Sequence, residues 1–415
     1  MNLASDRVDA AARSSRGTGF ALSIYVAVAA VLWVASWLSL RHYGVIAQGD
    51  PGVRFAGQGF LGGWVRYDGG WYVGIAAAGY SYSPGVQSSV AFFPAYPLAV
   101  RAVGEVVDNF GIAGVAVTVL SAAGAVGLYW RWLRDRLTAA AAPTALLVLL
   151  LFPYAWYLYG AVYADALFLL AALAAFTLIE RDHPVLAGIA GAVATAARPV
   201  GIAVLAGLIV RLLERRRALT VPEPTAVEGH ARVKAALAWA RVPTRVELRR
   251  VRPGDAGVLL SLGGISAWCV YLWNRFGDPF LFSSVETYWG QPANPYTWFK
   301  ITFVKYLVRG DDRVYAWGTL AQGLLAVAAL LAVPRVARRF GWGYGLYVLM
   351  LVAIPVIGSK DFQGLGRYLI AAFPLFALYG EELAARPGLR RVLLPVSGVI
   401  LVVMTAAFAH GIYLS

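Results

Sequence analysis

The chain has 415 residues, of which 60% are hydrophobic and only 14% are charged. Soluble globular proteins carry roughly 25% charged residues, so this composition excludes a soluble protein and indicates a membrane protein. The single cysteine, Cys269, excludes a disulfide framework, and the four scattered histidines form no metal-binding motif. The net charge of +14 would suggest a nucleic-acid partner in a soluble protein. Its meaning here depends on where the basic residues lie along the chain.

Segments that are apolar enough to cross a bilayer recur along the whole chain. A spanning helix needs about 20 apolar residues, because its backbone groups have to be hydrogen-bonded internally. The first such segment, residues 20 to 40, follows three arginines and is too long for a signal-peptide core, so we expect an uncleaved anchor. Further spans are expected at residues 111 to 130, 138 to 153, 163 to 180, 184 to 197, 200 to 213, 256 to 274, 317 to 333, 341 to 357, 367 to 383 and 392 to 412. The sequence therefore predicts an all-α polytopic membrane protein with about 11 transmembrane helices.

The basic residues indicate how these spans are oriented, because Lys and Arg collect in cytoplasmic loops. Alternate crossings place residues 1 to 19, 131 to 136, 181 to 183, 211 to 255, 334 to 340 and 381 to 391 on one side, and these segments hold 24 of the 36 basic residues. We therefore expect a multi-pass protein of the cell membrane with a cytoplasmic amino terminus and an external carboxyl terminus. The net charge then reflects topology, and no nucleic-acid partner is expected.

Two segments depart from the simple pattern of spans. Residues 91 to 104 are apolar but short, contain two prolines and Arg101, and are expected to form a juxtamembrane helix. Residues 184 to 213 could form one long helix, but its basic ends would then face opposite sides of the membrane. A break at Arg198 and Pro199 removes the conflict, since proline disfavours helical geometry at the residue before it and lacks a backbone donor.

The loops differ in composition, and together the segments are predicted to form one transmembrane domain over residues 1 to 415 with a cytoplasmic tail at 1 to 19. The long external loops at 41 to 110 and 275 to 316 are rich in Trp, Tyr and Phe. These residues lie at membrane interfaces or line ligand grooves. The cytoplasmic loop 214 to 254 is basic, and its amphipathic stretch at 230 to 242 favours binding to an anionic lipid surface over binding to nucleic acid.

Asp68 is an unusual carboxylate in the first external loop. It lies in the string YDGGWY, residues 67 to 72, where aromatic side chains surround it and glycines let a ligand come close. The structural alternative is that Asp68 pairs with Arg66 or caps a short helix that begins at Gly70. The residues alone leave both interpretations open.

Four further ionisable residues lie near the outer ends of predicted spans. Asp165 begins one span, and Arg198 interrupts another at a similar depth. Ionisable groups there are costly and mark a pathway or a site by default. Arg198, Lys360 and Arg367 could face one outer vestibule, where they would suit a lipid-borne phosphate. The alternatives are that Asp165 and Arg198 pair or cap helices, and that the cations extend to lipid headgroups.

The sequence contains neither a GxxxxGK[ST] phosphate loop nor a GxSxG serine elbow. Residues 57 to 62 match GxGxxG, but they lie in an external loop where no βαβ unit can follow. Any chemistry therefore has to use substrates that the membrane delivers.

A series of short strings then follows a characteristic order. The strings are YDGGWY at 67 to 72, IA at 75 to 76, GY at 79 to 80, AFFPAYPL at 91 to 98, FP at 152 to 153, YADALF at 163 to 168, ARPVG at 197 to 201, RY at 367 to 368 and FP at 373 to 374. This series covers most of the chain and resembles the PIG-V type mannosyltransferases, polytopic members of the GT-C glycosyltransferase superfamily. The family usually has Trp in place of Tyr67 and Glu in place of Asp165, and the second difference leaves the role of Asp165 open.

The resemblance implies a site and a reaction. Asp68 would be the catalytic base in the first external loop. Asp165, Tyr67, Trp71 and Tyr72 would line or support the acceptor site, and Arg198, Lys360 and Arg367 would bind the phosphate of a polyprenyl-phosphate sugar. Transfer of the sugar, expected to be mannose, to a lipid or glycan acceptor on the external face would invert the anomeric centre and require no metal or other cofactor.

Two further observations bear on this expectation. The 36 basic residues are nearly all arginine and the chain is rich in alanine, which suggests a GC-rich bacterial genome. An interrupted span also occurs in secondary transporters and lipid flippases, which are the alternative class of function. A non-catalytic assembly partner with a degenerate site is a third possibility.

Overall fold

The computed structural model describes residues 17–46, 59–220, 245–291, 294–309 and 313–414. These residues form helices joined by turns, together with one short antiparallel pairing of β1 (Leu219–Thr220) with β2 (Arg245–Val246). The all-α class predicted from the sequence is therefore confirmed for the described part of the chain.

Within that part, five helical segments are long and apolar enough to cross a membrane. They are α2 (Thr18–Tyr43), α5 (Phe110–Arg134), the continuous pair η7 (Pro253–Leu262) and α11 (Gly263–Phe276), α15 (Arg313–Phe340) and α19 (Pro387–His410). Shorter apolar helices are α6 (Ala141–Leu150), α8 (Pro184–Ala197) and α16 (Trp342–Gly358). The remaining predicted spans correspond to α7 (Asp165–Glu180), α9 (Ile202–Arg215) and α18 (Phe373–Ala384). The protein is a polytopic all-α membrane protein.

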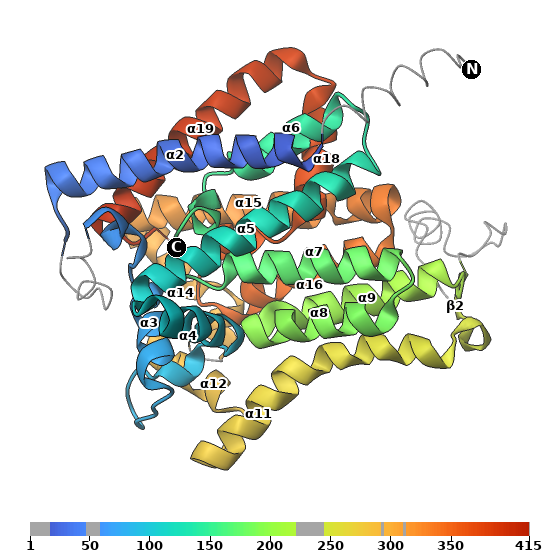
Figure 1. Ribbon diagram of the computed structural model, residues 1–415, viewed down its shortest axis with the longest axis horizontal. Helices are drawn as coiled ribbons and strands as arrows, with labels where there is room; N and C mark the ends of the chain where they lie inside the picture. The colour runs from blue at the N-terminus through green and yellow to red at the C-terminus, as the bar shows by residue number, and fades with distance from the viewer. Residues whose placement is uncertain (1–16, 47–58, 221–244, 292–293, 310–312, 415) are drawn as a thin grey trace.

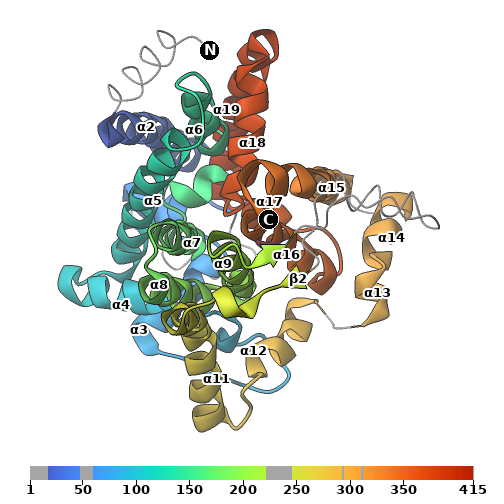
Figure 2. The same cartoon turned by 90° about the vertical axis from the view of Figure 1, so that its right-hand side faces the viewer.

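The helices form one bundle (Figures 1 and 2). At its centre α7 packs on α5 and α8, and α9 packs on α16, which in turn contacts α15. On another side α6 packs on α18, while α19 lies against α2 and crosses it at the top of Figure 1. The spans were predicted one by one, and the packing shows which of them are neighbours.

Small residues let α8 approach the η7–α11 helix closely. A Cβ atom on Gly188 would lie 2.0 Å from the carbonyl oxygen of Gly257, and one on Gly264 would lie 2.0 Å from that of Ala192. Helices in a membrane associate through such close contacts because burial of apolar side chains drives little association in lipid. The glycines therefore determine how α8 and α11 cross.

The expected break at Arg198 and Pro199 is present. Helix α8 ends at Ala197, Arg198 is extended with φ −154° and ψ 147°, and the 3₁₀ turn η5 (Pro199–Gly201) leads into α9. A Cβ atom on Gly201 would lie 2.5 Å from the carbonyl oxygen of Ala194, so the turn folds back tightly on α8. The break places the Arg198 side chain in the interior instead of at the end of a loop.

Two other predicted spans differ from the observed helices, the first in its length and the second in its continuity. The segment 138 to 153 is helical only over α6, after which residues 151–164 form turns and the 3₁₀ helix η4 (Ala155–Leu158). The segment 367 to 383 is divided into α17 (Leu365–Leu369) and α18. Proline explains both changes, because Pro153 follows α6 and Pro374 lies in the first turn of α18.

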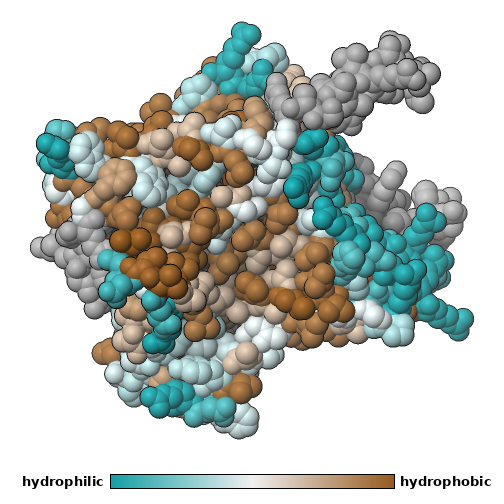
Figure 3. All heavy atoms as spheres, in the orientation of Figure 1, coloured by the Kyte–Doolittle hydropathy of each residue, from teal (hydrophilic) through white to brown (hydrophobic). Residues whose placement is uncertain are grey.

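The charged ends of the helices gather at one end of the bundle. Hydrophilic residues cover the right-hand end of the face shown in Figure 3, and hydrophobic residues cover its middle. The ion pairs that join these ends are Arg136–Glu180, Arg211–Glu180, Arg216–Asp182, Arg216–Asp255 and Arg339–Glu381. The segments around these residues were predicted to share one side of the membrane, and the structure brings them together. That this side is cytoplasmic stays a prediction, and the amphipathic stretch at 230 to 242 lies outside the described residues.

The two long loops that the sequence predicts to be external, called the first and second external loops here, fold into short helices at the other end of the bundle. The first contains η2 (Gly59–Trp64), α3 (Asp68–Ala78), η3 (Ser89–Ala91) and α4 (Ala95–Val107), and α4 is the predicted juxtamembrane helix. The second contains α12 (Leu281–Ser284), η8 (Val285–Trp289), α13 (Pro295–Trp298) and α14 (Ile301–Arg309). A further 3₁₀ turn, η6 (Leu248–Arg250), follows β2.

Candidate active site

Asp68 is the first residue of α3, and its side chain is 20% exposed. Its Oδ2 atom lies 3.0 Å from Nη1 of Arg367, a residue of α17. The backbone N–H of Asp68 donates to the hydroxyl of Tyr163 at 3.2 Å, and that hydroxyl donates to the carbonyl of Arg66 at 3.3 Å. Helix α3 begins at Asp68, two residues before the expected start at Gly70. The structure pairs Asp68 with Arg367, a residue that is far away in the sequence.

Asp165 and Arg198 form a second ion pair deeper in the protein. Asp165 begins α7, and its Oδ1 atom contacts Nη1 of Arg198 at the break between α8 and α9. The exposed fractions of the two side chains are only 4% and 7%. The two residues therefore pair with each other, which was the structural alternative for both.

Arg367 joins the two pairs, since its Nε atom lies 3.9 Å from Oδ2 of Asp165. We call the four residues Asp68, Arg367, Asp165 and Arg198 the charge cluster. Among the described residues the buried Arg367 Nε has no hydrogen-bond partner. An unused buried donor is costly, so this guanidinium has capacity for a further anionic or polar ligand.

Aromatic rings enclose the charge cluster. The Arg367 guanidinium carbon lies 5.3 Å from the centroid of the Tyr163 ring and 5.7 Å from that of Tyr157, and the Arg198 guanidinium carbon lies 4.1 Å from that of Tyr368. Rings at such distances attract cations and exclude water. Charges in this low-dielectric setting interact more strongly than they would in bulk water.

Lys360, the third predicted phosphate-binding cation, lies to one side of this group. A Cβ atom on Gly290 would lie 3.1 Å from Lys360 Nζ, and the backbone N–H of Lys360 donates to Oε1 of Gln291 at 2.7 Å. The structure thus places Lys360 against the second external loop, and no ion pair with Asp68 or Asp165 is found for it in the described residues.

The three aromatic residues beside Asp68 point in different directions. The Tyr67 hydroxyl donates to the carbonyl of Gly411 beyond α19, and Tyr67 itself has a positive φ of 49°. The Tyr72 ring is buried against Tyr96, with centroids 5.0 Å apart. Only Trp71 faces the second external loop, where its ring centroid lies 5.5 Å from that of Trp289. Tyr67 and Tyr72 therefore hold α3 in place, and Trp71 lies toward the loop that covers the site.

Sequence reasoning missed Glu286, which lies in η8 of that loop. Burial and, to a smaller extent, the negative charge of Asp68 raise the pKa of Glu286 to about 7, against the opposing effect of the positive charge of Arg367. Its string, VETYW, offered no signal beyond its aromatic residues. No feature of the local sequence indicates the influence of Asp68 and Arg367 on its pKa.

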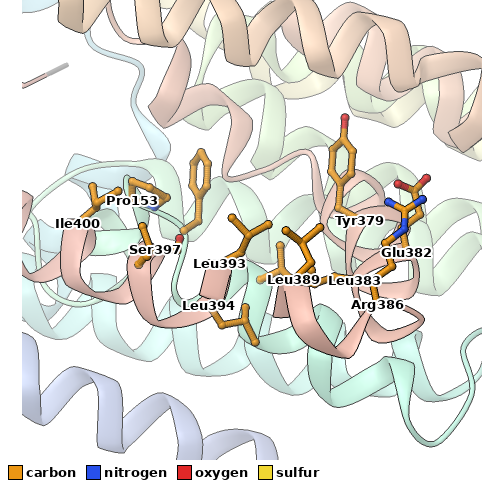
Figure 4. Close-up of a pocket in the computed structure, with 13 residues that line it drawn as sticks. Pro153, Tyr379, Glu382, Leu383, Arg386, Leu389, Leu393, Leu394, Ser397 and Ile400 are labelled. Atoms are coloured by element: carbon orange, nitrogen blue, oxygen red, sulfur yellow. The ribbon is translucent and has the colours of Figure 1, made fainter. Parts of the chain in front are cut away.

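Two apolar cavities lie along the side of α19. One of about 400 Å³ lies between α6, α18 and α19, with Arg386, Glu382 and Tyr379 at one end and Pro153 and Ile400 at the other (Figure 4). The other, of about 620 Å³, lies between α2, α6 and α19. Pro153 is followed by Tyr154, whose ring would be 2.4 Å from a Cβ atom on Gly366, the neighbour of Arg367. Pro153, at one end of the first cavity, is thus adjacent in the chain to a residue that packs beside Arg367.

Comparisons with known proteins leave the family of the chain open. No protein-family model matches the sequence, and no curated protein matches it. The structure is similar to the crystal structure of ArnT from Cupriavidus metallidurans bound to undecaprenyl phosphate, with a TM-score of 0.48 and 16% sequence identity. The similarity covers 96% of this chain and 77% of the ArnT chain.

Proposed function

We propose that the protein is an inverting membrane glycosyltransferase. It moves a sugar, which the resemblance to PIG-V type enzymes suggests is mannose, from a polyprenyl-phosphate donor to a hydroxyl of a lipid or glycan acceptor. The observation that carries this proposal is the charge cluster, in which a partly exposed carboxylate meets an enclosed guanidinium that has an unused donor. A base beside an anion-binding group is the arrangement that transfer from a phosphate-linked donor requires.

The chemistry follows from the donor. The bond between the anomeric carbon and the phosphate oxygen breaks, and the polyprenyl phosphate leaves with the bonding electrons. Because phosphate is a good leaving group, no general acid is needed, unlike in the hydrolysis of ordinary glycosides. Asp68 takes the proton of the acceptor hydroxyl as its oxygen attacks from the opposite face, so the anomeric configuration inverts.

The ion pairs suggest how the donor activates the site. Without substrate, Asp68 is engaged by Arg367. A donor phosphate gives Arg367 a second anion to bind, and guanidinium groups bind phosphate through two parallel hydrogen bonds. Arg367 would then pass from Asp68 to the phosphate and leave the carboxylate available to the acceptor. Arg198 and Lys360 would add positive charge near the leaving group, and no step in this scheme uses a metal.

The membrane supplies the donor. Polyprenyl chains are apolar, and the two cavities along α19 are lined mainly by apolar side chains. A chain lying there would bring its phosphate past Pro153 and Tyr154 to Arg367. With a cytoplasmic amino terminus, this reaction takes place on the external face of a bacterial cell membrane.

A secondary transporter or flippase is the second candidate, because Arg198 interrupts a helical pair. Transporters place their ionisable groups near the midplane, whereas here Asp68 belongs to a short helix of the first external loop. This position favours the transferase.

The experiment is to reconstitute the purified protein in vesicles that contain undecaprenyl-phosphate mannose labelled in the sugar, together with a lipid extract. A glycosyltransferase converts the label into a new glycoside that survives mild acid, which cleaves the donor. A flippase moves the labelled donor between leaflets without changing it chemically, and that result would contradict the proposal.

A further inference from the structure

The cavity between α6, α18 and α19 has one charged end and an apolar interior (Figure 4). Glu382 and Arg386 lie at the charged end, and leucine side chains of α19 line the middle. From Leu389 to Ile400 the cavity follows α19 for three helical turns, which is about 16 Å at 1.5 Å per residue. That length is about half of the roughly 30 Å hydrocarbon core of a bilayer. The cavity is therefore as deep as one leaflet.

The carboxylate at the charged end already has a cationic partner. Oε1 of Glu382 lies 2.8 Å from Nη1 of Arg335. The neighbouring Tyr379 hydroxyl donates to the carbonyl of Ala328 at 3.0 Å, so its hydrogen atom is also used. These contacts neutralise Glu382 and leave Arg386 as the charged side chain that lines this end of the cavity.

A second arginine lies on the same face of α19. Arg386 and Arg390 are one turn apart, and the backbone N–H of Arg390 donates to the Arg386 carbonyl at 3.0 Å. Residues three, four or seven positions apart share a face of a helix, so Arg390 lies on the face of Leu393 and Ser397, which line the cavity. In the part of the chain that the structure describes, no ion pair is found for either arginine. Two positive charges thus lie beside the cavity without a carboxylate partner there.

This combination of charge and apolar surface matches the chemistry of a phospholipid. Basic pockets between membrane-spanning helices on the cytoplasmic side bind anionic headgroups, and residues 381 to 391 are predicted to lie on that side. Guanidinium groups bind phosphate through paired hydrogen bonds. A zwitterionic headgroup brings its own cation, whereas an anionic one balances the arginines, so the charge favours an anionic lipid.

We propose that this cavity binds an anionic phospholipid, with the phosphate at Arg386 and Arg390 and one acyl chain along α19. A polyprenyl chain of the sugar donor would enter the cavity from the opposite end, beside Pro153. With the phospholipid in place, the cavity between α2, α6 and α19 stays available to that chain. The phospholipid site is separate from the charge cluster and does not depend on the proposed sugar transfer.

The test measures the Kd of dioleoylphosphatidylglycerol for the purified full chain in detergent, by native mass spectrometry. Dioleoylphosphatidylcholine has the same chains and no net charge, and wild type should bind it more weakly. Each arginine beside an anionic headgroup contributes about fivefold in affinity, so the double variant Arg386→Gln, Arg390→Gln should bind phosphatidylglycerol about thirtyfold more weakly. Arg391→Gln is the matched control, because Arg391 is exposed and helical spacing turns it away from the cavity.

A second pair of variants tests the acyl chain without changing a charge. Leu393→Trp places a large ring in the middle of the cavity, and displacing even two methylene groups costs about tenfold in affinity. It should weaken the binding of both lipids. Val392→Trp is the control, because Val392 is 59% exposed and does not line the cavity.

Three results would overturn the inference. Wild-type affinity for phosphatidylglycerol in the double arginine variant would show that the headgroup does not bind there. Unchanged affinity for both lipids in Leu393→Trp would show that the chain lies elsewhere. Displacement of one phosphatidylglycerol by one undecaprenyl-phosphate mannose would assign the cavity to the donor chain.

Discussion

The ion pair between Asp68 and Arg367 joins residues that are 299 positions apart in the chain. The sequence singled out Asp165, Arg198 and Arg367 because ionisable groups at the outer ends of spans are costly. It singled out Asp68 because aromatic residues and glycines surround this carboxylate. It could not show which of them pair, because pairing depends on how the spans pack. Glu286 escaped notice for the same reason, since the partial burial that raises its pKa depends on how its loop packs.

Replacing Arg367 should affect transfer far more than binding of the acceptor. Arg367→Ala removes the guanidinium that is proposed to release Asp68 and bind the phosphate of the sugar donor. Loss of one such hydrogen-bond donor costs on the order of 10²–10³ in rate. The measurement is kcat/KM with the polyprenyl-phosphate sugar as the varied substrate. Arg101→Ala on the surface of α4 is the matched control. Unchanged kcat/KM in Arg367→Ala would show that Arg367 does not contact the donor.

Arg198 provides a second test at the same scale. Arg198→Ala should raise the Kd of the donor more than the KM of the acceptor, because its buried guanidinium lies in the charge cluster. Asp165 would then be left buried without Arg198, so Tm should fall as well, since breaking a buried pair costs roughly 3–5 kcal/mol. The double variant Arg198→Ala, Asp165→Ala should recover part of that loss. Donor affinity equal to that of the wild type would reduce Arg198 to a structural role.

At the scale of elements, the close crossing of α8 and α11 fixes how these two helices pack against each other. Gly264 faces the Ala192 carbonyl with no room for a side chain, whereas a Cβ atom on the neighbouring Gly263 would make an ordinary contact 3.8 Å from the Ala192 Cβ. A side chain can therefore be accommodated at Gly263 but not at the adjacent Gly264.

Gly264→Ala should lower the Tm of the purified protein, because overpacking of a close helix contact costs roughly 1–3 kcal/mol. Gly263→Ala should leave the Tm unchanged or raise it slightly, because alanine is the better helix former. Equal effects of the two substitutions would contradict the close approach of α8 and α11.

The elements also show where sequence reasoning reached its limit. Hydrophobic runs located the long helices, and proline with charge parity located the break after Ala197. The break between α17 and α18 was missed because its residues are apolar and buried, so hydropathy does not separate them from helix. Irregular backbone is tolerated at such depth only where protein surrounds it. The segment 151–164 meets that condition, since it carries Tyr157 and Tyr163 to the charge cluster.

For the whole molecule, the distribution of basic residues predicts which end faces the cytoplasm. The single cysteine makes a direct test simple. In a Cys269→Ser background, Val86→Cys in the first long loop should react with a membrane-impermeant maleimide in intact cells. Leu248→Cys, at the basic end, should react only after permeabilisation, because Lys and Arg are retained on the cytoplasmic side. Both wild-type side chains are exposed, at 53% and 71%, so access to reagent depends on side. The reverse labelling would invert the proposed topology.

The net charge of the molecule is consistent with this topology. Most of the basic residues in the described part of the chain lie in segments that the structure gathers at one end of the bundle, where several form ion pairs with Glu180, Asp182, Asp255 and Glu381. Outside the segments predicted to be cytoplasmic, the other 12 basic residues of the chain include Arg198 and Arg367, the two cations of the charge cluster. The proposed glycosyl transfer at the opposite end thus depends on a small number of charged residues.

The central claim is that Asp68 is the base of a glycosyl transfer, and its substitution tests this claim most directly. Purified wild type, Asp68→Asn and Asp68→Ala are compared for transfer of mannose from undecaprenyl-phosphate mannose to lipid extract, with Glu105→Gln as control. Loss of a general base costs about 10²–10⁴-fold in rate, so both Asp68 variants should fall into that range while donor binding persists. Transfer by both variants at the wild-type rate would contradict the claim.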